Sequence, residues 1–398
     1  MSNTLKFGNG EWYGKKDTIL AYNDENSNFK PLPFSFDRAS SATVVNKAGL
    51  IETVGSGEPR IDFKDNTKGA LLLEPTRSNV LPHSNNYDEW TKGNSTVTSG
   101  QIGVGGSLDA WKLQKNASGG YVGRTGFSYD GVSTFSIFAK AGSVDWIRVT
   151  SQSGNFRFNV NLSNGEVGVT GSLITSTSVE YYGDGWYRCT ATGDSLASGF
   201  YVKPAETDDD TSGVDGFIFI QNSQVETNSS YATSYIPTQG SAVTRVADAC
   251  NNGANEQVIN STEGVLYVET SKINESEGEG TIALSRDSNN EIRLNFATNN
   301  RLNVFVNVLG DNQVYMDNAD YNLEEYNKIA IKYKLNDYSV FVNGSKIHTD
   351  TDATVPSGLN LVDFNQGTSS NKFYGNTKDV RVYNTALTDQ ELINLTTI

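Results

Sequence analysis

Three consecutive carboxylates offer the clearest metal-ligand chemistry in this sequence. Asp208, Asp209 and Asp210 lie in a segment that also contains glutamate, threonine and serine side chains. Ca²⁺ takes six to eight oxygen ligands, so an oxygen-rich loop of this kind could hold it. The spacing of an EF-hand loop is absent, which favours a solvated loop without metal over a calcium site. We therefore expect no cofactor, and a calcium ion at these three residues is the alternative that the sequence leaves open.

Aromatic side chains on exposed strand positions could bind a sugar, because the C–H face of a pyranose ring packs against an aromatic ring. Trp146 lies near the entrance of a predicted strand. Tyr181 and Tyr182 are adjacent, so on a strand they point to opposite faces and one of them is outside. Scattered surface aromatics without function are common, which is the alternative. Trp146, Tyr181 and Tyr182 are therefore the candidate glycan contacts.

No motif for catalysis is apparent in the sequence. A glycosidase needs two carboxylates about 5 Å or 6.5–9.5 Å apart, and no Glu-x-Asp-x-x-Glu spacing places such acids on one strand face. His348 follows an Asn-Gly turn on a predicted strand, without a recognisable partner. We assign no catalytic residue and expect a protein that is not an enzyme.

Charge and composition restrict the partners. The chain has 398 residues, with 31 Lys and Arg against 46 Asp and Glu, so its formal net charge is −15. This charge repels phosphate backbones and anionic lipids, and we expect neither a nucleic-acid nor a membrane partner. Two cysteines and two histidines are too few for a disulfide framework or a histidine-rich metal site. The first residues lack the apolar stretch of a secretory signal, so we expect no export.

Strands must position these side chains, and the composition favours strands. With 19 Tyr, 18 Phe and 38 Gly, the chain is typical of strands joined by tight turns. Apolar and polar residues alternate over 146–150 and 156–162, as in strands with one buried face. Thr388 followed by Glu391 predicts a capping box that begins a short C-terminal helix.

We therefore expect an all-β chain in which an N-terminal segment precedes two antiparallel β-sandwich (jelly-roll) domains and the short helix. Residues 1–80 hold few apolar positions, so we expect them to need a partner surface and not to fold alone. A cooperative melt of the isolated fragment would contradict this. The expected parts are the segment 1–80, a jelly roll at 81–247, a polar linker at 248–257 and a sandwich at 258–398.

Distinctive motifs recur along nearly the whole chain. In the first block they are Phe36-Asp-Arg-Ala-Ser-Ser-Ala-Thr, Gly49-Leu-Ile-Glu, Glu58-Pro-Arg, Gly69-Ala-Leu-Leu-Leu-Glu-Pro-Thr-Arg-Ser-Asn and Trp90. In the middle block they are Gly185-Trp-Tyr-Arg-Cys, Gln224-Val-Glu, Thr233-Ser-Tyr-Ile-Pro-Thr and Val243-Thr-Arg-Val-Ala-Asp. In the last block they are Val342-Asn-Gly and Asp379-Val-Arg-Val-Tyr-Asn-Thr-Ala-Leu-Thr-Asp-Gln-Glu-Leu.

These motifs resemble bacteriophage virion surface proteins of the head-fibre or tail-appendage type, as in crAss-like and related Bacteroides and Flavobacterium phages. The middle block resembles a carbohydrate-binding-module-like jelly roll, and the last block a concanavalin A-like (laminin-G-like) lectin domain. The resemblance implies that residues 1–80 attach to capsid or tail proteins. It also implies a homo-oligomer, dimer or trimer, that is assembled in the host cytoplasm and binds a host surface glycan. The alternatives are inert structural decoration without ligand and, less favoured, a polysaccharide depolymerase.

Overall fold

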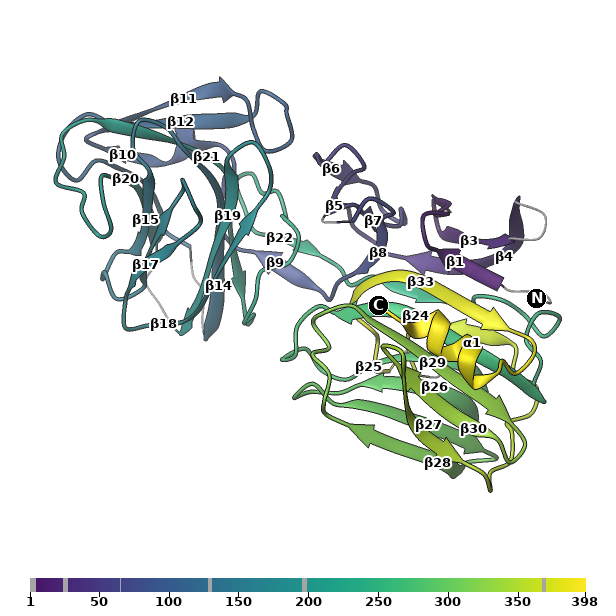
Figure 1. The fold of residues 1–398 in the computed structure, drawn as a ribbon. Coiled ribbons are helices and arrows are strands. Elements are labelled where there is room, and N and C mark those ends of the chain that lie inside the picture. Colours follow the sequence, from purple (N-terminus) through teal and green to yellow (C-terminus); the bar gives the residue numbers. More distant parts are fainter. Residues whose placement is uncertain (1–4, 24–27, 65, 128–130, 195–198, 367–369) are drawn as a thin grey trace. The chain divides into compact units, whose positions relative to one another are not determined.

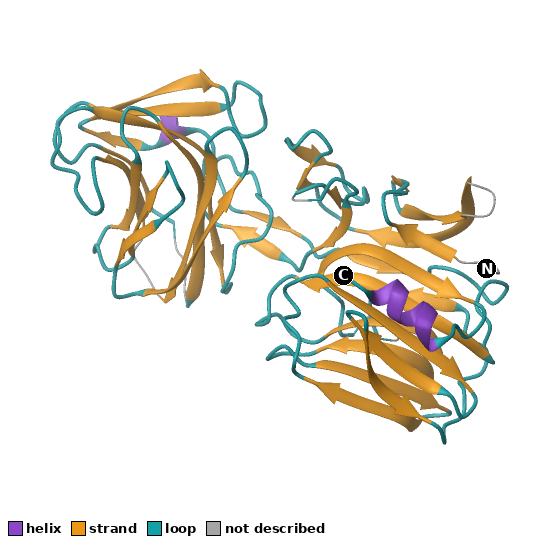
Figure 2. Cartoon of the chain, in the orientation of Figure 1, coloured by secondary structure: helices purple, strands orange, loops and turns teal. Residues whose placement is uncertain are grey.

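Strands dominate the structure, and the described part of the chain contains one α-helix, at its C-terminal end (Figure 2). Within that part, no helix is long and apolar enough to cross a membrane. The expectation of an all-β fold is therefore confirmed. The computed structural model describes residues 5–23, 28–64, 66–127, 131–194, 199–366 and 370–398.

The chain forms two compact units, each built from strands (Figure 1). The first unit comprises residues 1–47, 54–75 and 247–398, and the second comprises residues 48–53 and 76–246. Two short strands lie near the first boundary between the units. Strand β5 (Ala42–Val45) belongs to the first unit, whereas β6 (Ile51–Val54) begins in the second unit and ends at the first residue of the next first-unit segment.

Two antiparallel sheets enclose the main core of the first unit. The smaller sheet has the order β28 (Asp311–Asn318), β27 (Leu302–Val308), β26 (Asn290–Phe296), β25 (Gly280–Asp287), β32 (Leu361–Asp363). The larger has the order β23 (Ala249–Asn251), β4 (Asn28–Asp37), β3 (Thr18–Asn23), β1 (Leu5–Gly8), β33 (Gly375–Tyr383), β24 (Glu263–Lys272), β29 (Asn327–Lys334), β30 (Tyr338–Val342), β31 (Ser345–Asp350). In it β2 (Gly14–Lys15) pairs with β3, and β7 (Ile61–Asp62) with β8 (Ala70–Leu73), which pairs with β33.

Strands from the N-terminal residues complete this larger sheet. One edge of β33 pairs with β24, and its other edge pairs with β1 and β8. Leu5 and Leu71 are at most 2% exposed and share one core with Val382 near the C-terminus. The expected boundaries at 80 and 258 therefore differ from the observed division. The expected linker differs as well, because Cys250 is a buried core residue that pairs with Phe36.

Residues 76–246 of the second unit are an insertion in the chain of the first unit, and the first-unit residues that flank this insertion are hydrogen-bonded to each other. The backbone N–H of Asp248 donates to the carbonyl oxygen of Glu74 at 3.0 Å. The N–H of Glu74 donates to Asp248 Oδ2 at 2.8 Å. The chain thus leaves the first unit after residue 75 and returns at residue 247 beside its point of departure.

The second unit is likewise an antiparallel sandwich with its own core. Its six-stranded sheet has the order β10 (Thr91–Gly93), β13 (Tyr121–Thr125), β20 (Gly199–Ala205), β15 (Trp146–Ser151), β16 (Arg157–Asn161), β17 (Val167–Thr170). The eight-stranded sheet has the order β11 (Ser95–Gln101), β12 (Ala110–Lys115), β21 (Gly216–Thr227), β14 (Val132–Ala141), β19 (Trp186–Asp194), β18 (Ile174–Tyr181). In addition, β9 (Arg77–Asn79) pairs with β21, and β22 (Val243–Arg245) pairs with β9. A 3-10 turn, η1, spans Tyr87–Glu89.

Local sequence signals fix the C-terminal helix as expected. Helix α1 (Asp389–Thr396) begins after Thr388, whose Oγ1 accepts from the Glu391 N–H, while Glu391 Oε2 accepts from the Thr388 N–H. Leu392 is fully buried among residues of β24, β29, β30 and β33. The helix therefore covers the face of the larger sheet that lies opposite the main core.

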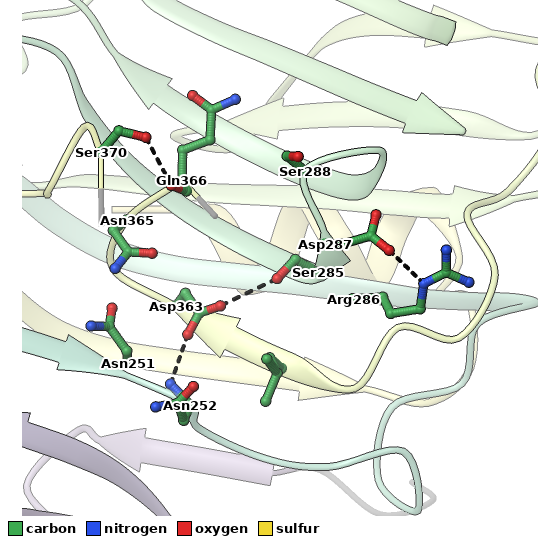
Figure 3. Close-up of a pocket in the computed structure, with 11 residues that line it drawn as sticks. Asn251, Asn252, Ser285, Arg286, Asp287, Ser288, Asp363, Asn365, Gln366 and Ser370 are labelled. Atoms are coloured by element: carbon green, nitrogen blue, oxygen red, sulfur yellow. Dashed lines mark hydrogen bonds and ion pairs between the residues drawn. The ribbon is translucent and has the colours of Figure 1, made fainter. Parts of the chain in front are cut away.

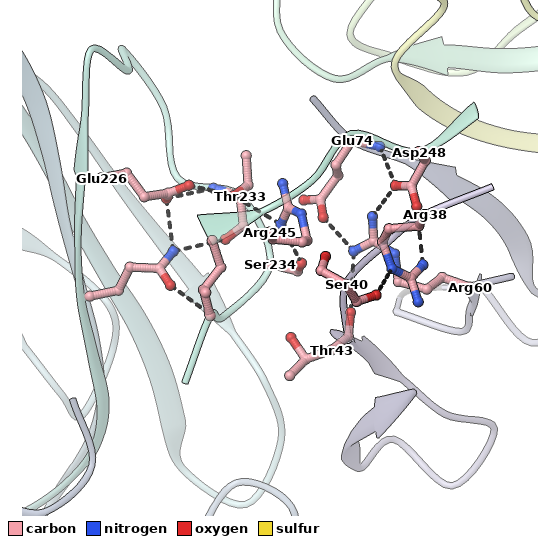
Figure 4. Close-up of polar contacts among 12 residues, drawn as sticks. Arg38, Ser40, Thr43, Arg60, Glu74, Glu226, Thr233, Ser234, Arg245 and Asp248 are labelled. Carbon is pink, nitrogen blue, oxygen red and sulfur yellow. Dashed lines mark hydrogen bonds and ion pairs between the residues drawn. The ribbon is translucent and has the colours of Figure 1, made fainter. Parts of the chain in front are cut away.

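A buried charge network fixes the N-terminal motifs of the first unit (Figure 4). Arg38 and Arg60 both donate to the carboxylate of Asp248, and Arg60 also pairs with Glu74. The side chains of Arg38, Arg60 and Asp248 are 0% exposed. Backbone carbonyls of Ser40, Gly55 and Thr43 accept further hydrogen bonds from the two guanidinium groups.

A second network, also drawn in Figure 4, lies within the second unit. Glu226 is fully buried and accepts from Gln224 Nε2 at 2.8 Å and from the Thr233 N–H at 2.9 Å. Arg245 Nη1 donates to Thr233 Oγ1 at 3.2 Å, and Arg188 Nη2 donates to the Thr233 carbonyl at 2.6 Å. Burial raises the pKa of the Glu226 carboxyl above its ordinary value. These residues come from the Gln-Val-Glu, Thr-Ser-Tyr-Ile-Pro-Thr, Gly-Trp-Tyr-Arg and Val-Thr-Arg-Val-Ala-Asp motifs, which therefore have a structural role.

Candidate functional site

The six-stranded sheet of the second unit has an outer face rich in aromatic and basic side chains. On β15, Ile147 and Val149 are buried in the core, so the alternate residues point outward. Register places Lys203 of β20 beside Arg148, and Tyr201 beside Thr150. We call the following five residues the basic–aromatic face: Tyr121, Arg148, Thr150, Tyr201 and Lys203.

Two glycines allow the tyrosine rings to lie against the sheet. A Cβ atom added to Gly93 would lie 2.2 Å from Tyr121 Cε1, and one added to Gly123 would lie 2.3 Å from Tyr201 Cδ1. Both separations are shorter than carbon atoms can approach without displacement. The ring centroids of Tyr121 and Tyr201 are 4.9 Å apart, in an edge-to-face arrangement. The glycines thus create an aromatic platform on adjacent strands.

Lys203 is a cation without a carboxylate partner. Its ammonium lies 5.8 Å from the centroid of the Tyr121 ring and makes no hydrogen bond or ion pair with any residue that the structure describes. Burial, and then the charge of the neighbouring Arg148, lower the pKa of Lys203 below its ordinary value. An anion placed beside both cations would relieve this repulsion.

Arg148 is held in position by an acid from a nearby loop. Its Nη1 lies 3.1 Å from Asp209 Oδ1, and the Nε of Arg157 lies 3.3 Å from the same oxygen. Asp209 therefore pairs with both arginines, whereas Lys203 pairs with no acid among the residues that the structure describes.

A shallow cavity of about 300 Å³ lies over this face. All five residues of the basic–aromatic face line it, and the turn that follows β15 forms its rim. Aromatic, hydroxyl, ammonium and guanidinium groups thus converge on one space that is open to solvent. Such a surface can pack against a sugar ring, accept and donate hydrogen bonds to hydroxyls, and pair with an acidic group.

The structure places Trp146 on the same outward side of β15, two residues before Arg148. It is half-buried and does not line the cavity. Residues two apart on a strand are about 6.5 Å apart, so Trp146 lies next to Arg148 at one end of the basic–aromatic face. Its role as a glycan contact stays a prediction.

Tyr181 and Tyr182 lie away from this face, at the end of β18 and just beyond it. Tyr181 is 57% exposed, and its ring contacts Tyr187. Tyr182 is half-buried and packs edge-on against Phe138. The two rings thus point in different directions, and they form no common platform with Trp146.

The three acidic residues proposed as calcium ligands each have a separate partner. Asp208 accepts from the Val169 N–H, Asp209 pairs with the two arginines, and Asp210 Oδ1 accepts from the Ser212 N–H. That last bond is the main cause that lowers the pKa of Asp210. Among the described residues, no group of three His, Cys, Asp or Glu side chains could hold a metal ion. Calcium binding stays a prediction, and we base no proposal on it.

Sequence reasoning did not find the basic–aromatic face. A partial signal was present, because Arg148 and Thr150 alternate with Trp146 on a strand that the sequence predicts. Tyr201 and Lys203 alternate in the same way on β20. Their proximity depends on which strands pair and in which register, and the sequence pattern does not specify this pairing.

Comparison with known proteins supports one part of the expected architecture. Residues 271–393 match the family model described as the concanavalin A-like lectin/glucanases superfamily. This match confirms a concanavalin A-like sandwich in the C-terminal part of the chain. A search of curated proteins found no match.

Similar folds occur among solved structures of carbohydrate-binding modules and sialidases. The CBM40 of a Ruminococcus gnavus IT-sialidase bound to α2,3-sialyllactose is 21% identical, with 36% of this chain and 86% of that chain covered and a TM-score of 0.31. Domain 4 of a GH43 extracellular arabinanase from Geobacillus stearothermophilus, in complex with arabinotriose, is 12% identical, with 43% and 84% covered and a TM-score of 0.31. A Trypanosoma rangeli sialidase in complex with the inhibitor DANA is 10% identical, with 98% and 77% covered and a TM-score of 0.31.

Proposed function

We propose that this protein binds glycans, and that the basic–aromatic face of the second unit is a site for an acidic saccharide. One observation carries the proposal: Lys203 and Arg148 lie side by side next to a tyrosine pair seated on glycines. The tyrosine rings provide apolar area for the sugar ring, and the two cations provide charge-assisted hydrogen bonds for a carboxylate, sulfate or phosphate group. The site is shallow, so we expect weak binding that several copies strengthen.

The double variant Arg148→Ala, Lys203→Ala is expected to lose most of its affinity for acidic oligosaccharides. Charge-assisted hydrogen bonds contribute about 1.5–3 kcal/mol, or roughly 10- to 150-fold in Kd for one bond. Isothermal titration calorimetry measures the Kd of both proteins. The ligands are oligosaccharides of galacturonate and glucuronate, together with sialylated and sulfated oligosaccharides. Wild-type binding should weaken as ionic strength rises, because salt screens the charges.

Lys112→Ala is the matched control. Lys112 lies on β12 of the other sheet in the same unit, where its ammonium lies over the ring of Phe217. The Lys112→Ala variant loses one positive charge but keeps the basic–aromatic face intact, so its Kd should stay within about twofold of the wild-type value. Equal affinity of the double variant and wild type, or no binding of any acidic oligosaccharide, would refute the proposal.

We further propose that the protein is an adhesin on a bacteriophage virion rather than an enzyme, as a dimer or trimer. The sequence motifs support this placement. Because residues 5–23 contribute core strands to the first unit, we propose attachment to capsid or tail proteins through that unit as a whole and not through a separate 1–80 segment.

Two experiments test this placement. Antibody labelling of purified particles should decorate the virion surface, and unlabelled particles would refute it. In affinity electrophoresis through gels that contain host capsular polysaccharide, the protein should be retarded while the polymer keeps its length. Shortened polymer would instead establish a depolymerase. No retardation on any host polymer would favour inert decoration.

A further inference from the structure

Strand β18 forms one edge of the eight-stranded sheet in the second unit (Figure 1). One side of β18 pairs with β19, and no strand that the structure describes pairs with its outer side. In the turn that joins the two strands, the N–H of Tyr182 donates to the carbonyl oxygen of Trp186. Backbone groups alternate along an antiparallel strand, so the N–H and C=O groups of Thr177, Val179 and Tyr181 point away from β19. A row of such unpaired groups is a template for another strand.

Other edges of the second unit carry features that block pairing. At the edge strand β17, the two carboxylate oxygens of Asp208 accept from the Val169 N–H at 2.9 and 3.0 Å. A side chain thus occupies the place that a partner strand would take. At the edge strand β11, the register shifts between Thr98 and Gln101, and Gly100 has a φ of 78°. A bulge of this kind bends the edge and interrupts pairing.

Edges of the first unit are protected as well. Beside β32, Gly253 and Val362 exchange backbone hydrogen bonds. Asp363 Oδ1 accepts from the Asn252 N–H at 2.7 Å, and Figure 3 shows this contact in the wall of a cavity of about 680 Å³. Strand β28 contains two aspartates, and β31 contains a lysine and an aspartate. Charged side chains on an edge strand are a common means of preventing association.

Strand β18 lacks these protections over most of its length. Its sequence, Ile-Thr-Ser-Thr-Ser-Val-Glu-Tyr, contains no proline or lysine, and Glu180 is its single charged residue. The register of β18 on β19 shifts only at its beginning, between Ile174 and Ser176. Ser176, Ser178 and Tyr181 are exposed. Copies of a chain with a net charge of −15 repel each other, so an edge with one charge is a place where two copies can approach.

We propose that two copies of this chain associate through their β18 strands, which pair antiparallel about a two-fold axis at Val179. In this register Thr177 faces Tyr181 of the second copy, and each facing pair of this kind exchanges two backbone hydrogen bonds. The Tyr181 side chain, which is 57% exposed, gains contacts across the axis. The proposal rests on the oligomer proposed above, for which it names the contact surface, and it is independent of glycan binding.

A second copy suits this edge because the pairing is self-complementary. Two-fold symmetry makes every contact twice. Glu180 faces Ser178 of the second copy, so the single charges of the two strands do not oppose each other, and a serine hydroxyl can donate to the carboxylate. Strands paired about a two-fold axis close at two copies, so this surface gives a dimer and not a trimer.

Sedimentation equilibrium of the full chain tests the proposal, at about 100 µM because small interfaces form weak complexes. The wild type should show about twice the 43.3 kDa mass of one chain. Ser178→Glu should raise the dimer Kd by about tenfold or more, because it places a carboxylate opposite Glu180 at two symmetric positions. Ser178 is exposed, so the thermal melt of this variant should match that of the wild type.

Two matched variants separate pairing from a general effect of charge. Ser178→Lys places an ammonium opposite Glu180, so the dimer should persist or become tighter. Thr96→Glu adds a carboxylate at an exposed position of β11, the opposite edge of the same sheet, and should keep the dimer Kd within about twofold of wild type.

The outcomes also distinguish this proposal from the glycan site. Ser178→Glu should bind a short acidic oligosaccharide with the wild-type Kd in isothermal titration calorimetry, so either site can fail without the other. A wild-type chain that is monomeric or trimeric would overturn the proposal. So would equal dimer Kd values for Ser178→Glu and the wild type, or a dimer that Thr96→Glu dissociates.

Discussion

A shortened chain in which residues 1–75 are joined to residues 247–398 by a short Gly-Ser linker is expected to fold cooperatively, whereas residues 248–398 alone are not. The linker can be short because Glu74 and Asp248 are hydrogen-bonded to each other. Without the N-terminal strands, β33 loses its hydrogen-bonded partners along one edge, and the main core loses the apolar side chains that those strands contribute. The apolar side chains that would be lost, each at most 2% exposed, are Leu5, Phe7, Ile19, Phe34, Phe36, Leu71 and Leu73.

Thermal unfolding followed by circular dichroism measures the outcome. At about 1.5–3 kcal/mol for each of the seven buried side chains, the loss is roughly 10–20 kcal/mol, which is as large as or larger than the roughly 5–15 kcal/mol that stabilises a typical domain. Residues 76–246 expressed alone are the matched control and should melt cooperatively, since that unit has its own core. A sharp melt of 248–398 alone, near the temperature of the joined chain, would contradict this account of the fold.

Asp248→Ala is expected to lower the free energy of unfolding of the first unit by about 3–5 kcal/mol. Asp248 pairs with Arg38 and Arg60 where all three side chains are 0% exposed. Removing the carboxylate takes an ion-pair partner from both buried guanidinium groups, and it removes the acceptor for the Glu74 N–H. Uncompensated buried charge is among the most destabilising changes in a protein.

Urea unfolding with two probes assigns the effect to one unit. Four of the five tryptophans lie in the second unit, so fluorescence reports mainly on that unit, while circular dichroism reports on both. The far-ultraviolet transition of the first unit should shift and the main fluorescence transition should not. Asp311→Ala, an exposed position on β28, is the control and should change the free energy by no more than about 0.5 kcal/mol. A similarly small change for Asp248→Ala would refute the role of the network.

Several motifs that carry the resemblance to phage proteins are explained by these networks. Arg38, Arg60 and Glu74 come from three separate N-terminal motifs, and they meet at Asp248 from the end of the middle block. Glu226 and Thr233 meet in the same way in the second unit. Specific spacing in a sequence can thus reflect buried polar contacts, whereas the residues proposed here to bind ligands lie outside these motifs.

The sequence alone determined the features that depend on neighbouring residues. The alternation of apolar and polar residues over 146–150 predicted a strand with one buried face, and the spacing of Thr388 and Glu391 predicted the capped helix. Both signals can be read from the sequence because the strand period and helix capping involve residues only a few positions apart. It also identified the C-terminal sandwich by its motifs, within the segment that the family model matches.

Only the tertiary structure decided which distant segments join. The pairing of β1 and β8 with β33 unites the two ends of the chain, and it depends on core packing across more than 300 residues of sequence. The same holds for the candidate site and for the proposed dimer surface. Arg148 and Lys203 meet through strand register, and β18 offers a free edge because it is the last strand in the order of its sheet. Local propensity does not encode such long-range contacts, because the burial that stabilises them exists only once the sheets have formed.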